Sequence, residues 1–432
     1  MYLQKIMLQN FRCFENLSVP FHEKLTVIVG TNGAGKTAIL EAAAIAAGTL
    51  LSSFDGVSGA GIRKTDASNK YFKMGSVIDV QPQYPVCVSG EGVVENQSLS
   101  WTRSLNGANG KTTLIDAKEM TEISKRYEMK MMHGDTSFPM PIVAYYGTGR
   151  LWDYHRAKRI DAFKNNNRAN AYIDCLDGTA NVKLMINWFK KMALTEERSA
   201  NASAEFTAVR HAMEQCFVLM TGYDSVEIQF NYDTGEIDVS YWNEDGNSVK
   251  IPLNQLSDGY KGTISLIADI AYRMAVLNPF LLDRVLTETT GVILIDEIDL
   301  HLHPAWQQRI IGDLTQIFPK VQFIVSTHAP AVINSVKSEN LIILRDQAVL
   351  HLQNQVYGKD VKSVLNEVMG VTERPVEIAQ MFTQFYEYLG CKDFDAAEQK
   401  LNEIDVKRDY HDPEIANCRV KLKLERIRGG QV

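Results

Sequence analysis

Short continuous runs of apolar residues recur along the chain and predict buried strands. The clearest are Leu25–Val29, Gly291–Ile295 and Val321–Val325, and Pro141–Tyr146 has the same character. Their residues do not alternate between apolar and polar, and most are β-branched or aliphatic, which is typical of strands covered on both faces in a parallel sheet. The pattern therefore predicts an α/β fold around a buried sheet.

Alternation and composition predict the elements near the N-terminus. Apolar and polar residues alternate around Ile6–Leu8 and Leu17–Val19, which indicates two short strands joined by a tight connection. Residues Thr37–Leu51 are dominated by Ala, Ile and Leu and predict a helix. Further strands are expected near residues 75–80, 86–89 and 98–102.

The middle of the chain predicts an insertion within one large domain of residues 1–345. Helices are expected between about residues 155 and 222, notably over Val182–Leu194 and Ala204–Met220. Two apolar runs flanking an Asp-Thr-Gly turn, Val226–Phe230 and Glu236–Tyr241, predict a hairpin. The helical and hairpin insertion thus covers about residues 155–250.

Helical periodicity takes over beyond about residue 345. Pro375 and Pro413 mark helix starts, since proline suits the first helical turn. Apolar residues recur at helical spacing in two segments, and Glu414–Arg428 adds a charged amphipathic helix. Residues 346–432 are therefore expected to form a C-terminal helical module. The two periodic sets are Ile378, Met381, Phe385 and Leu389, and Phe394, Ala397, Leu401 and Ile404.

Composition fits a folded protein and argues weakly against a dedicated DNA binder. Of 432 residues, 45% are hydrophobic and 22% are charged, as in ordinary globular proteins. The formal charge is −7, whereas a duplex-DNA binder normally carries a basic balance or stripe. Basic residues do cluster at Arg156–Arg159 and Lys421–Arg428, where a solvated helix face is favoured over a nucleic-acid contact.

Cysteine usage and hydropathy indicate a cytoplasmic protein with no membrane partner. The six cysteines lie far apart without a C-x-x-C pair, which favours reduced thiols over disulfides or a zinc site. The N-terminus lacks the charged and apolar segments of a signal peptide. No uncharged apolar run approaches the ~20 residues of a membrane span.

A phosphate-binding loop follows the first buried strand. Residues Gly30–Thr37 fit G-x-x-x-x-G-K-[ST] and lie between a predicted strand and a predicted helix, which is the context that this motif requires. Glycines let backbone N–H groups and the helix N-terminus face phosphate. Lys36 would neutralise the β- and γ-phosphates, and Thr37 would offer its hydroxyl to Mg²⁺. We therefore expect ATP and Mg²⁺ as ligands.

Two adjacent carboxylates, Asp296 and Glu297, end the second buried strand. A carboxylate at the end of a buried strand is destabilised by desolvation unless another group compensates its charge. Mg²⁺ held through water by Asp296 is the expected compensation, and Glu297 would polarise the attacking water. The motif is weak alone and becomes specific after a phosphate-binding loop.

The order of two further residues relative to Asp296 along the chain suggests functional roles for them. Ser257 opens a predicted helix and precedes Asp296 by 39 positions (296 − 257); taken alone, it would be an ordinary helix N-cap. His328 follows Asp296 by 32 positions (328 − 296) and comes directly after the third buried strand. An isolated histidine is usually structural, but one beside a nucleotide site can contact the γ-phosphate.

The order of these motifs resembles the ABC/SMC/RecF superclass of AAA-type ATPases, over most of residues 1–345. Among its members, the chain is most similar to compact bacterial ATPases, namely the OLD-family ATPase domain and the ATPases of Septu and retron-linked antiphage systems. The matching segments are Phe11–Phe14, Gly30–Thr37, Leu256–Gly259, Ile295–Asp299 with His301–Pro304, and Ser326–Pro330.

The resemblance implies an ABC-type P-loop head with a mixed sheet, and it implies roles for individual residues. Ser257 and Gly259 look like the signature that closes over the γ-phosphate held by a second copy, and Asp299 looks like a dimer-facing residue. Arg12 is similar to an N-terminal residue that contacts nucleotide. The residues implied to serve the nucleotide and metal in cis are Asn32, Gly33, Ala34, Gly35, Lys36, Thr37, Ala38, Asp296, Glu297 and His328.

The chain departs from the family pattern at one point. These ATPases carry a glutamine between the phosphate-binding loop and the signature, and Gln81 and Gln83 are both candidates here. His301 and His303 invite a metal-site interpretation, but a loop role is favoured.

The spacing between the motifs along the chain distinguishes the possible functions. A transporter ATPase would have its signature much closer than the 221 positions that separate Lys36 from Ser257 (257 − 36), and an SMC head would carry a long heptad pattern. A self-contained OLD nuclease would need a metal-binding domain after His328, where only 104 residues follow (432 − 328). We therefore expect ATP hydrolysis without intrinsic nuclease activity.

Our main hypothesis is a regulatory ATPase of an antiphage system. It would form a homodimer or higher oligomer through the nucleotide site and control a separate nuclease. By family analogy the partner would be an HNH-type nuclease, or the ATPase would belong to a retron complex, so that contact with nucleic acid is indirect. The alternative is a RecF/SMC-like DNA-repair ATPase that acts on DNA directly.

Overall fold

The computed structural model spans residues 1–432 and divides into two compact units, Met1–Lys359 and Asp360–Val432. The Arg156–Arg159 cluster and part of the predicted helical stretch lie outside the described residues. The residues that the structure describes are 1–57, 59–74, 77–151, 168–178, 182–199, 203–223, 225–243, 245–350, 355–370, 374–406 and 413–428.

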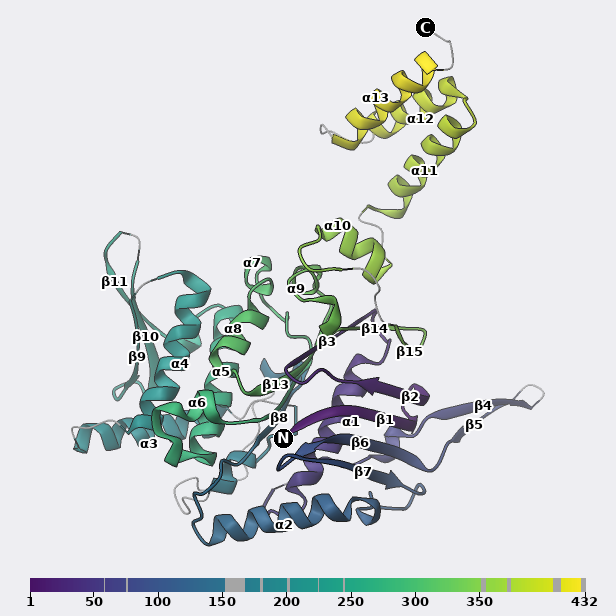
Figure 1. The fold of residues 1–432 in the computed structure, drawn as a ribbon. Helices are drawn as coiled ribbons and strands as arrows, with labels where there is room; N and C mark the ends of the chain where they lie inside the picture. Colours follow the sequence, from purple (N-terminus) through teal and green to yellow (C-terminus); the bar gives the residue numbers. More distant parts are fainter. Residues whose placement is uncertain are drawn as a thin grey trace. The chain divides into compact units, whose positions relative to one another are not determined.

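A six-stranded mixed sheet forms the centre of the first unit (Figure 1). Its strands run parallel except for the antiparallel edge strand β15. The four predicted buried strands are confirmed as β3, β8, β12 and β13, whereas β14 and β15 were not predicted. In spatial order the strands are β15 (Ala348–Leu350), β14 (Leu341–Arg345), β3 (Leu25–Gly30), β13 (Val321–Thr327), β12 (Gly291–Ile295) and β8 (Ile142–Tyr146).

Helix α1 (Lys36–Ala47) lies between this sheet and a second, antiparallel one. The helix contacts strands of both sheets, and its small alanines allow that close packing because most of them are buried. Trp101 fixes the second sheet to the helix by donating a 2.9 Å hydrogen bond from Nε1 to the carbonyl of Ala46. The second sheet has the order β2 (Phe14–Pro20), β1 (Tyr2–Phe11), β6 (Val86–Val94) and β7 (Gln97–Leu105).

The insertion supplies a helical and β layer beside the central sheet (Figure 1). Helix α5 (Asp258–Leu277) packs on β8, and α3 (Val182–Ser199) and α4 (Ala204–Thr221) pack on α5. The predicted hairpin is confirmed as β9 (Val226–Asn231) and β10 (Glu236–Trp242), and β11 (Ser248–Pro252) extends it to three strands.

Several elements were not predicted from the sequence. Helix α2 (Lys118–Met132) packs against β7, with Ile123 and Tyr127 buried. Strand β4 (Asn69–Met74) was not predicted either; it pairs with β5 (Val77–Pro82), which is the strand expected near residues 75–80, in a two-stranded ribbon that projects from the unit (Figure 1). Short helices complete the first unit: α6 (Val285–Glu288), α7 (Pro304–Gln307), α8 (Ile310–Ile317) and α9 (Pro330–Ile333).

The second unit is helical. Helices α11 (Val376–Gly390), α12 (Phe394–Val406) and α13 (Pro413–Arg428) follow the short α10 (Val361–Val364). The apolar residues that recur at helical spacing form its core, including Phe385, Ala397 and Leu401. The division into units falls after Lys359 because β14 and β15 belong to the central sheet. The functional division at residue 345 stays a prediction.

The fold prediction is thus confirmed: the chain has an α/β head with a mixed sheet and a C-terminal helical region. None of the helices within the described residues is long and apolar enough to cross a lipid bilayer.

Candidate nucleotide-binding site

The loop between β3 and α1 has the geometry of a phosphate cradle. Gly33 and Gly35 have φ of +79° and +101°, a left-handed region that favours glycine. A Cβ at Gly35 would also overlap the ring of Phe14. No side chain caps the first turn of α1, and no acidic residue lies there. The N–H groups of this turn are therefore available to an anionic ligand.

Lys36 lies over this loop with only 6% of its surface exposed. Its Nζ donates to the carbonyls of Gly30 (2.9 Å) and Thr31 (3.1 Å). Burial lowers the pKa of the Lys36 ammonium, and the charges of Asp296, Glu297 and Asp299 oppose that shift. The direct hydrogen-bond partners of this buried cation are neutral carbonyl groups. A phosphate ligand would place a negative charge in direct contact with the ammonium group.

The side chains of Thr37 and Asp296 meet at the carboxyl end of β12. Thr37 Oγ1 donates to Asp296 Oδ2 at 2.7 Å, and Ser326 Oγ donates to Asp296 Oδ1 at 2.5 Å. Asp296 is 1% exposed, so these hydroxyls stabilise a buried carboxylate. Hydroxyl and carboxylate oxygens are the hard ligands that Mg²⁺ prefers, and the cluster therefore fits that ion.

Glu297 follows in an unusual backbone conformation. Its φ of +47° is rare for a residue other than glycine, and such strain persists where the surroundings hold it. Its N–H donates a 2.8 Å hydrogen bond to Ser326 Oγ, so Ser326 joins both carboxylate residues. Sequence reasoning missed Ser326, although it begins the Ser-Thr-His segment that includes His328.

His328 lies just beyond β13, beside the same cluster. Burial, and next the charge of Lys36, lowers the pKa of its imidazole, which favours the neutral form. Asp299 Oδ1 accepts hydrogen bonds from Thr327 Oγ1 (2.5 Å) and from the His328 N–H (3.4 Å). Asp299, expected to face a second copy, is thus also anchored to the end of β13.

Arg12 forms ion pairs with two carboxylates, which sequence reasoning missed. It pairs with Asp66 at 2.9 Å and with Glu41 on α1. Burial alone would lower the pKa of its guanidinium, but the charges of Glu41 and Asp66 raise it overall. These ion pairs hold Arg12 beside Glu41, which lies about one helical turn from Thr37 on α1. A contact between Arg12 and the nucleotide stays a prediction.

A cavity of about 610 Å³ opens beside the Thr37–Asp296 pair. One wall is the side of α1 that carries Thr37 and Glu41, and the others come from residues 59–66 and from the loop after β8. Among its lining residues, Glu41, Arg63, Asp66 and Thr148 were not singled out from the sequence.

Comparisons with known proteins agree with this geometry. Residues 5–216 match a family model described as an AAA domain, and residues 155–334 match one described as "AAA domain, putative AbiEii toxin, Type IV TA system". The chain is an AAA-family ATPase.

Two curated relatives align with most of the ATPase. "Retron Vc95 probable ATPase" of Vibrio cholerae serotype O1 biovar El Tor is 28% identical over 87% of this chain and 80% of its own length. "Septu protein PtuA" of Bacillus thuringiensis is 26% identical over 100% of this chain and 99% of its own length. A solved SMC head bound to the C-winged helix domain of ScpA is 16% identical, with a TM-score of 0.48, and covers 82% of this chain and 98% of that one.

The predicted signature residues of the ATPase lie at the start of α5. Ser257 takes the N-cap position, but its side chain makes no capping hydrogen bond. A Cβ at Gly259 would lie 2.7 Å from the carbonyl oxygen of His301 and 3.2 Å from the Trp306 ring, so only glycine fits there. Neither Ser257 nor Gly259 is among the described residues that line the cavity beside Thr37.

Neither candidate glutamine of the ATPase lies at this cavity. Gln81 is on the projecting ribbon and donates to Asp79 Oδ2 at 2.8 Å, and Gln83 donates to the carbonyl of Gln81 at 2.8 Å. Nδ1 of His303 accepts a hydrogen bond from the Ala305 N–H at the start of α7. No group of three or more metal-binding side chains occurs in the part of the chain that the structure describes.

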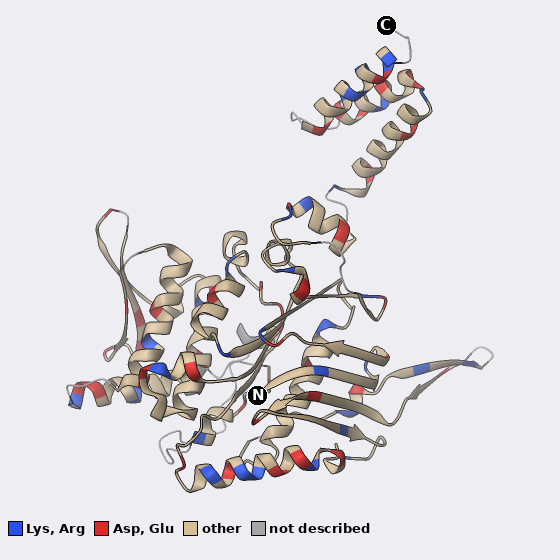
Figure 2. Cartoon of the chain, in the orientation of Figure 1, with Lys and Arg blue, Asp and Glu red and all other residues tan. Residues whose placement is uncertain are grey.

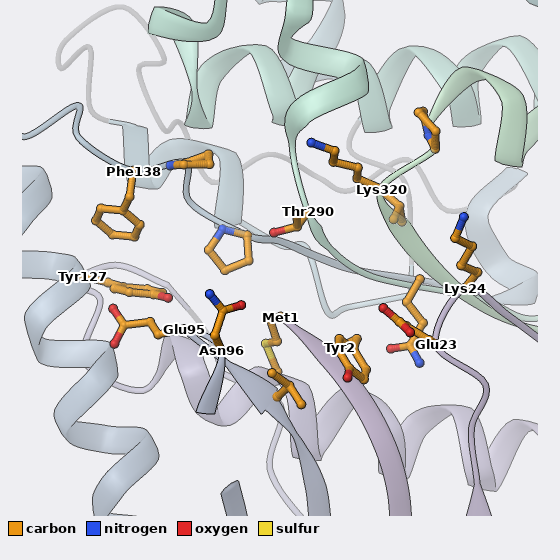
Figure 3. Close-up of a pocket in the computed structure, with 16 residues that line it drawn as sticks. Met1, Tyr2, Glu23, Lys24, Glu95, Asn96, Tyr127, Phe138, Thr290 and Lys320 are labelled. Atoms are coloured by element: carbon orange, nitrogen blue, oxygen red, sulfur yellow. The ribbon is translucent and has the colours of Figure 1, made fainter. Parts of the chain in front are cut away.

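A second cavity, of about 500 Å³, lies at the opposite ends of the strands (Figure 3). Thr290 precedes β12 and Pro141 precedes β8, so this cavity is at the amino ends of the parallel strands. Tyr127 and Phe138 lie in tilted contact on one side of it, with ring centroids 5.0 Å apart. Ligands of open parallel sheets bind at the carboxyl ends, which favours the end of the sheet that carries Thr37 and Asp296, and not this second cavity, for the nucleotide.

Proposed function

We propose that this ATPase binds ATP with Mg²⁺ at Gly30–Thr37 and hydrolyses it with Glu297 as the general base. The hydrogen bond between Thr37 and Asp296 carries the proposal. It joins the two expected metal donors, the exposed Thr37 and the buried Asp296, beside Lys36, which is an arrangement suited to phosphoryl transfer to water.

Each protein group has a defined task in this reaction. Lys36 and the N–H groups of α1 hold the phosphates and neutralise negative charge as it develops on the leaving group. Glu297 accepts a proton from water as the water oxygen attacks the γ-phosphorus and the bond to the ADP oxygen breaks. His328, neutral at pH 7, is suited to donate a hydrogen bond to the γ-phosphate. Mg²⁺, when bound, supplies charge that stabilises the phosphate oxygens.

We further propose that the site is completed by a second copy of the chain. Ser257 and Gly259 begin α5, and the Ser257 side chain is not used as a helix cap. Gly259 packs closely on His301 and Trp306, which keeps this helix start fixed. A hydroxyl and a helix N-terminus without a capping side chain suit a γ-phosphate bound by another subunit. ATP would thus join two copies.

The biological role that we propose is control of a partner nuclease in cytoplasmic antiphage defence. The support comes from the relatives, since one is named a retron probable ATPase and another, matched over nearly its full length, a Septu protein. An HNH-type nuclease is the expected partner. Control by ATP would arise because dimerisation changes the surface that the nuclease contacts.

The C-terminal helical unit is suited to hold that partner. Helix α13 buries Ile415, Cys418 and Leu422 in its own unit. Its other side exposes Val420, Leu424 and Ile427, which are 56%, 51% and 63% exposed. These residues are spaced by four and three positions and form an apolar stripe, the kind of surface that binds another helix.

The alternative function, direct action on DNA, receives less support. The basic residues of α13 lie beside acidic partners: Arg426 is 2.9 Å from Asp395 and 2.7 Å from Glu398. Figure 2 shows Lys and Arg interspersed with Asp and Glu on α2 and on the C-terminal helices. This mixture weakens any positive field that would attract a phosphate backbone.

Lys36→Ala tests the proposed function in cells and in vitro. The variant should lose ATP binding, fail to protect cells from phage, and still bind its nuclease if the C-terminal unit holds the partner. ATPase assays with and without DNA separate the two functions, because a DNA-repair ATPase would be stimulated by DNA alone. Protection that survives Lys36→Ala would contradict the proposal.

A further inference from the structure

The end of β8 is tied to the end of the strand that carries the two catalytic carboxylates. β8 is the edge strand parallel to β12, and Tyr146 pairs with Ile295 in the register. The N–H of Asp296 then donates a 2.8 Å hydrogen bond to the carbonyl of Tyr146. The residues after Tyr146 therefore leave the sheet level with Asp296 and Glu297.

The loop that follows β8 is held in place by its backbone. The N–H of Gly147 donates a 2.7 Å hydrogen bond to the carbonyl of Gly178, and Tyr146 forms a β-bridge with Gly178. A Cβ at Gly147 would lie 3.1 Å from that same carbonyl oxygen, which favours glycine. Thr148 comes next, begins a short 3₁₀ helix (Thr148–Leu151) and is exposed.

Thr148 lines the same cavity as Thr37 and Asp296. Among the described residues that line this cavity, none is a glutamine. Gln81, one candidate for the family's glutamine, lies on the projecting ribbon and donates to Asp79, and Gln83, the other candidate, follows the ribbon and donates to the carbonyl of Gln81. A hydroxyl side chain, that of Thr148, therefore lines the same cavity as the two expected metal donors.

We propose that Thr148 orients the attacking water in this chain, in place of a glutamine. The inference rests on the proposed function, in which Glu297 accepts the proton of that water. Thr148 Oγ1 holds the water oxygen by a hydrogen bond as it attacks the γ-phosphorus. One water proton passes to Glu297, the bond to the ADP oxygen breaks, and Thr148 neither gains nor loses a proton overall.

The chemistry of the hydroxyl suits this task. A threonine hydroxyl can donate one hydrogen bond and accept two, so it can match either orientation of a water molecule. Threonine is shorter than glutamine, so the proposed role requires the loop to lie closer to the phosphate than a loop that carries a glutamine. The flanking Gly147 and Gly149 remove two side chains that would keep the loop away.

The test compares Thr148→Val with Thr148→Ser. Valine keeps the shape of threonine but removes the hydroxyl, whereas serine keeps the hydroxyl. The expected result for Thr148→Val is a fall in kcat of about tenfold, the size of one lost hydrogen bond, with unchanged affinity for a fluorescent ATP analogue in Mg²⁺. Trapping of ADP with aluminium fluoride, which imitates the transition state, should weaken in parallel. Thr148→Ser should restore both measurements.

Gln81→Ala and Gln83→Ala are the matched controls and should hydrolyse ATP at the wild-type rate. Wild-type kcat in Thr148→Val, or a loss of turnover in either glutamine variant, would overturn the inference. Glu297→Gln separates this failure from failure of the proposed function. If Glu297→Gln is inactive while Thr148→Val is fully active, only the role of Thr148 is wrong; if Glu297→Gln is fully active, the proposed base is wrong as well.

Discussion

Thr37 Oγ1 and Asp296 Oδ2 are joined by a 2.7 Å hydrogen bond between residues 259 positions apart in the chain. The bond connects the first turn of α1 to the carboxyl end of β12. Ser326 adds a second hydroxyl to the same carboxylate from β13. One buried acid therefore joins three elements that approach the expected nucleotide from different parts of the sequence.

Asp296→Asn should separate metal binding from nucleotide binding. The amide keeps hydrogen-bonding capacity but removes the charge that would attract Mg²⁺, so ATP should still bind through Lys36 while its affinity no longer rises with Mg²⁺. Titration of a fluorescent ATP analogue with and without Mg²⁺ measures this difference. An unchanged Mg²⁺ dependence would show that Asp296 is not the metal-binding carboxylate.

Replacement of His328 should alter the pH dependence of stability. Burial and the charge of Lys36 lower the pKa of its imidazole below the ordinary value of 6.5. The folded protein thus binds this proton more weakly than the unfolded chain, so the stability contribution is present above about pH 6.5 and is lost as pH falls through the lower folded pKa. His328→Gln should therefore lose less stability than wild type on acidification.

Urea unfolding at about pH 7.5 and about pH 5.5 measures this contribution. His211, which is exposed on α4, offers a control. His211→Gln is the same substitution at a histidine outside the nucleotide site. Equal acid sensitivity of the wild type and His328→Gln would contradict the expected shift.

Arg273 should be among the residues most important for stability of the head. It donates to Asp269 at 2.7 Å and to the carbonyls of Ala171 and Ile173, and the two charged side chains are 2% and 0% exposed. Tyr146 also donates to Asp269, at 2.7 Å. Arg273→Met would leave a buried carboxylate without its cation and should lower the free energy of unfolding by about 3–5 kcal/mol.

The matched control removes an exposed ion pair. Arg126 lies 2.6 Å from Glu95 and is 49% exposed. Arg126→Met should change the free energy of unfolding by less than about 1 kcal/mol. Comparable losses in the two variants, measured by urea unfolding, would contradict the importance assigned to the buried pair.

The sequence predicted the parts of the site whose signal is local. The phosphate-binding loop needs glycines and a lysine at fixed spacing, and the carboxylates follow an apolar strand directly. The buried strands could be predicted for the same reason, because β3, β12 and β13 consist mainly of apolar residues. Helical periodicity likewise predicted the C-terminal core around Phe385.

The remaining features depend on contacts between distant segments. Ser326 hydrogen-bonds to Asp296 and Thr148 lines the same cavity as Asp296 because β13 and β8 flank β12 in the sheet. Glu41 and Asp66 carry no motif, and their pairing with Arg12 arises where α1 meets the loop before β4. Helix α2 has a low apolar content, so its sequence gives only a weak helical signal. Its packing against β7 stabilises it in the folded protein.

Glu297→Gln should retain ATP and lose turnover. The amide cannot accept the proton of the attacking water, while Lys36 and Thr37 still hold the nucleotide. Single-turnover assays should show bound ATP that is not converted to ADP, and the ATP-bound variant should accumulate as a dimer in light scattering. Normal hydrolysis by this variant would refute the assignment of the base.

The central claim is that each nucleotide site is shared between two copies of the chain, and mixing two inactive variants tests it most directly. Lys36→Ala removes the phosphate-binding lysine but keeps Ser257, and Ser257→Arg obstructs the signature but keeps Lys36. Each variant alone should be inactive. A mixed dimer contains one intact site, so an equal mixture should recover up to roughly a quarter of wild-type ATPase activity for a two-fold symmetric dimer. A mixture as inactive as its components, although mixed dimers form, would contradict the shared site.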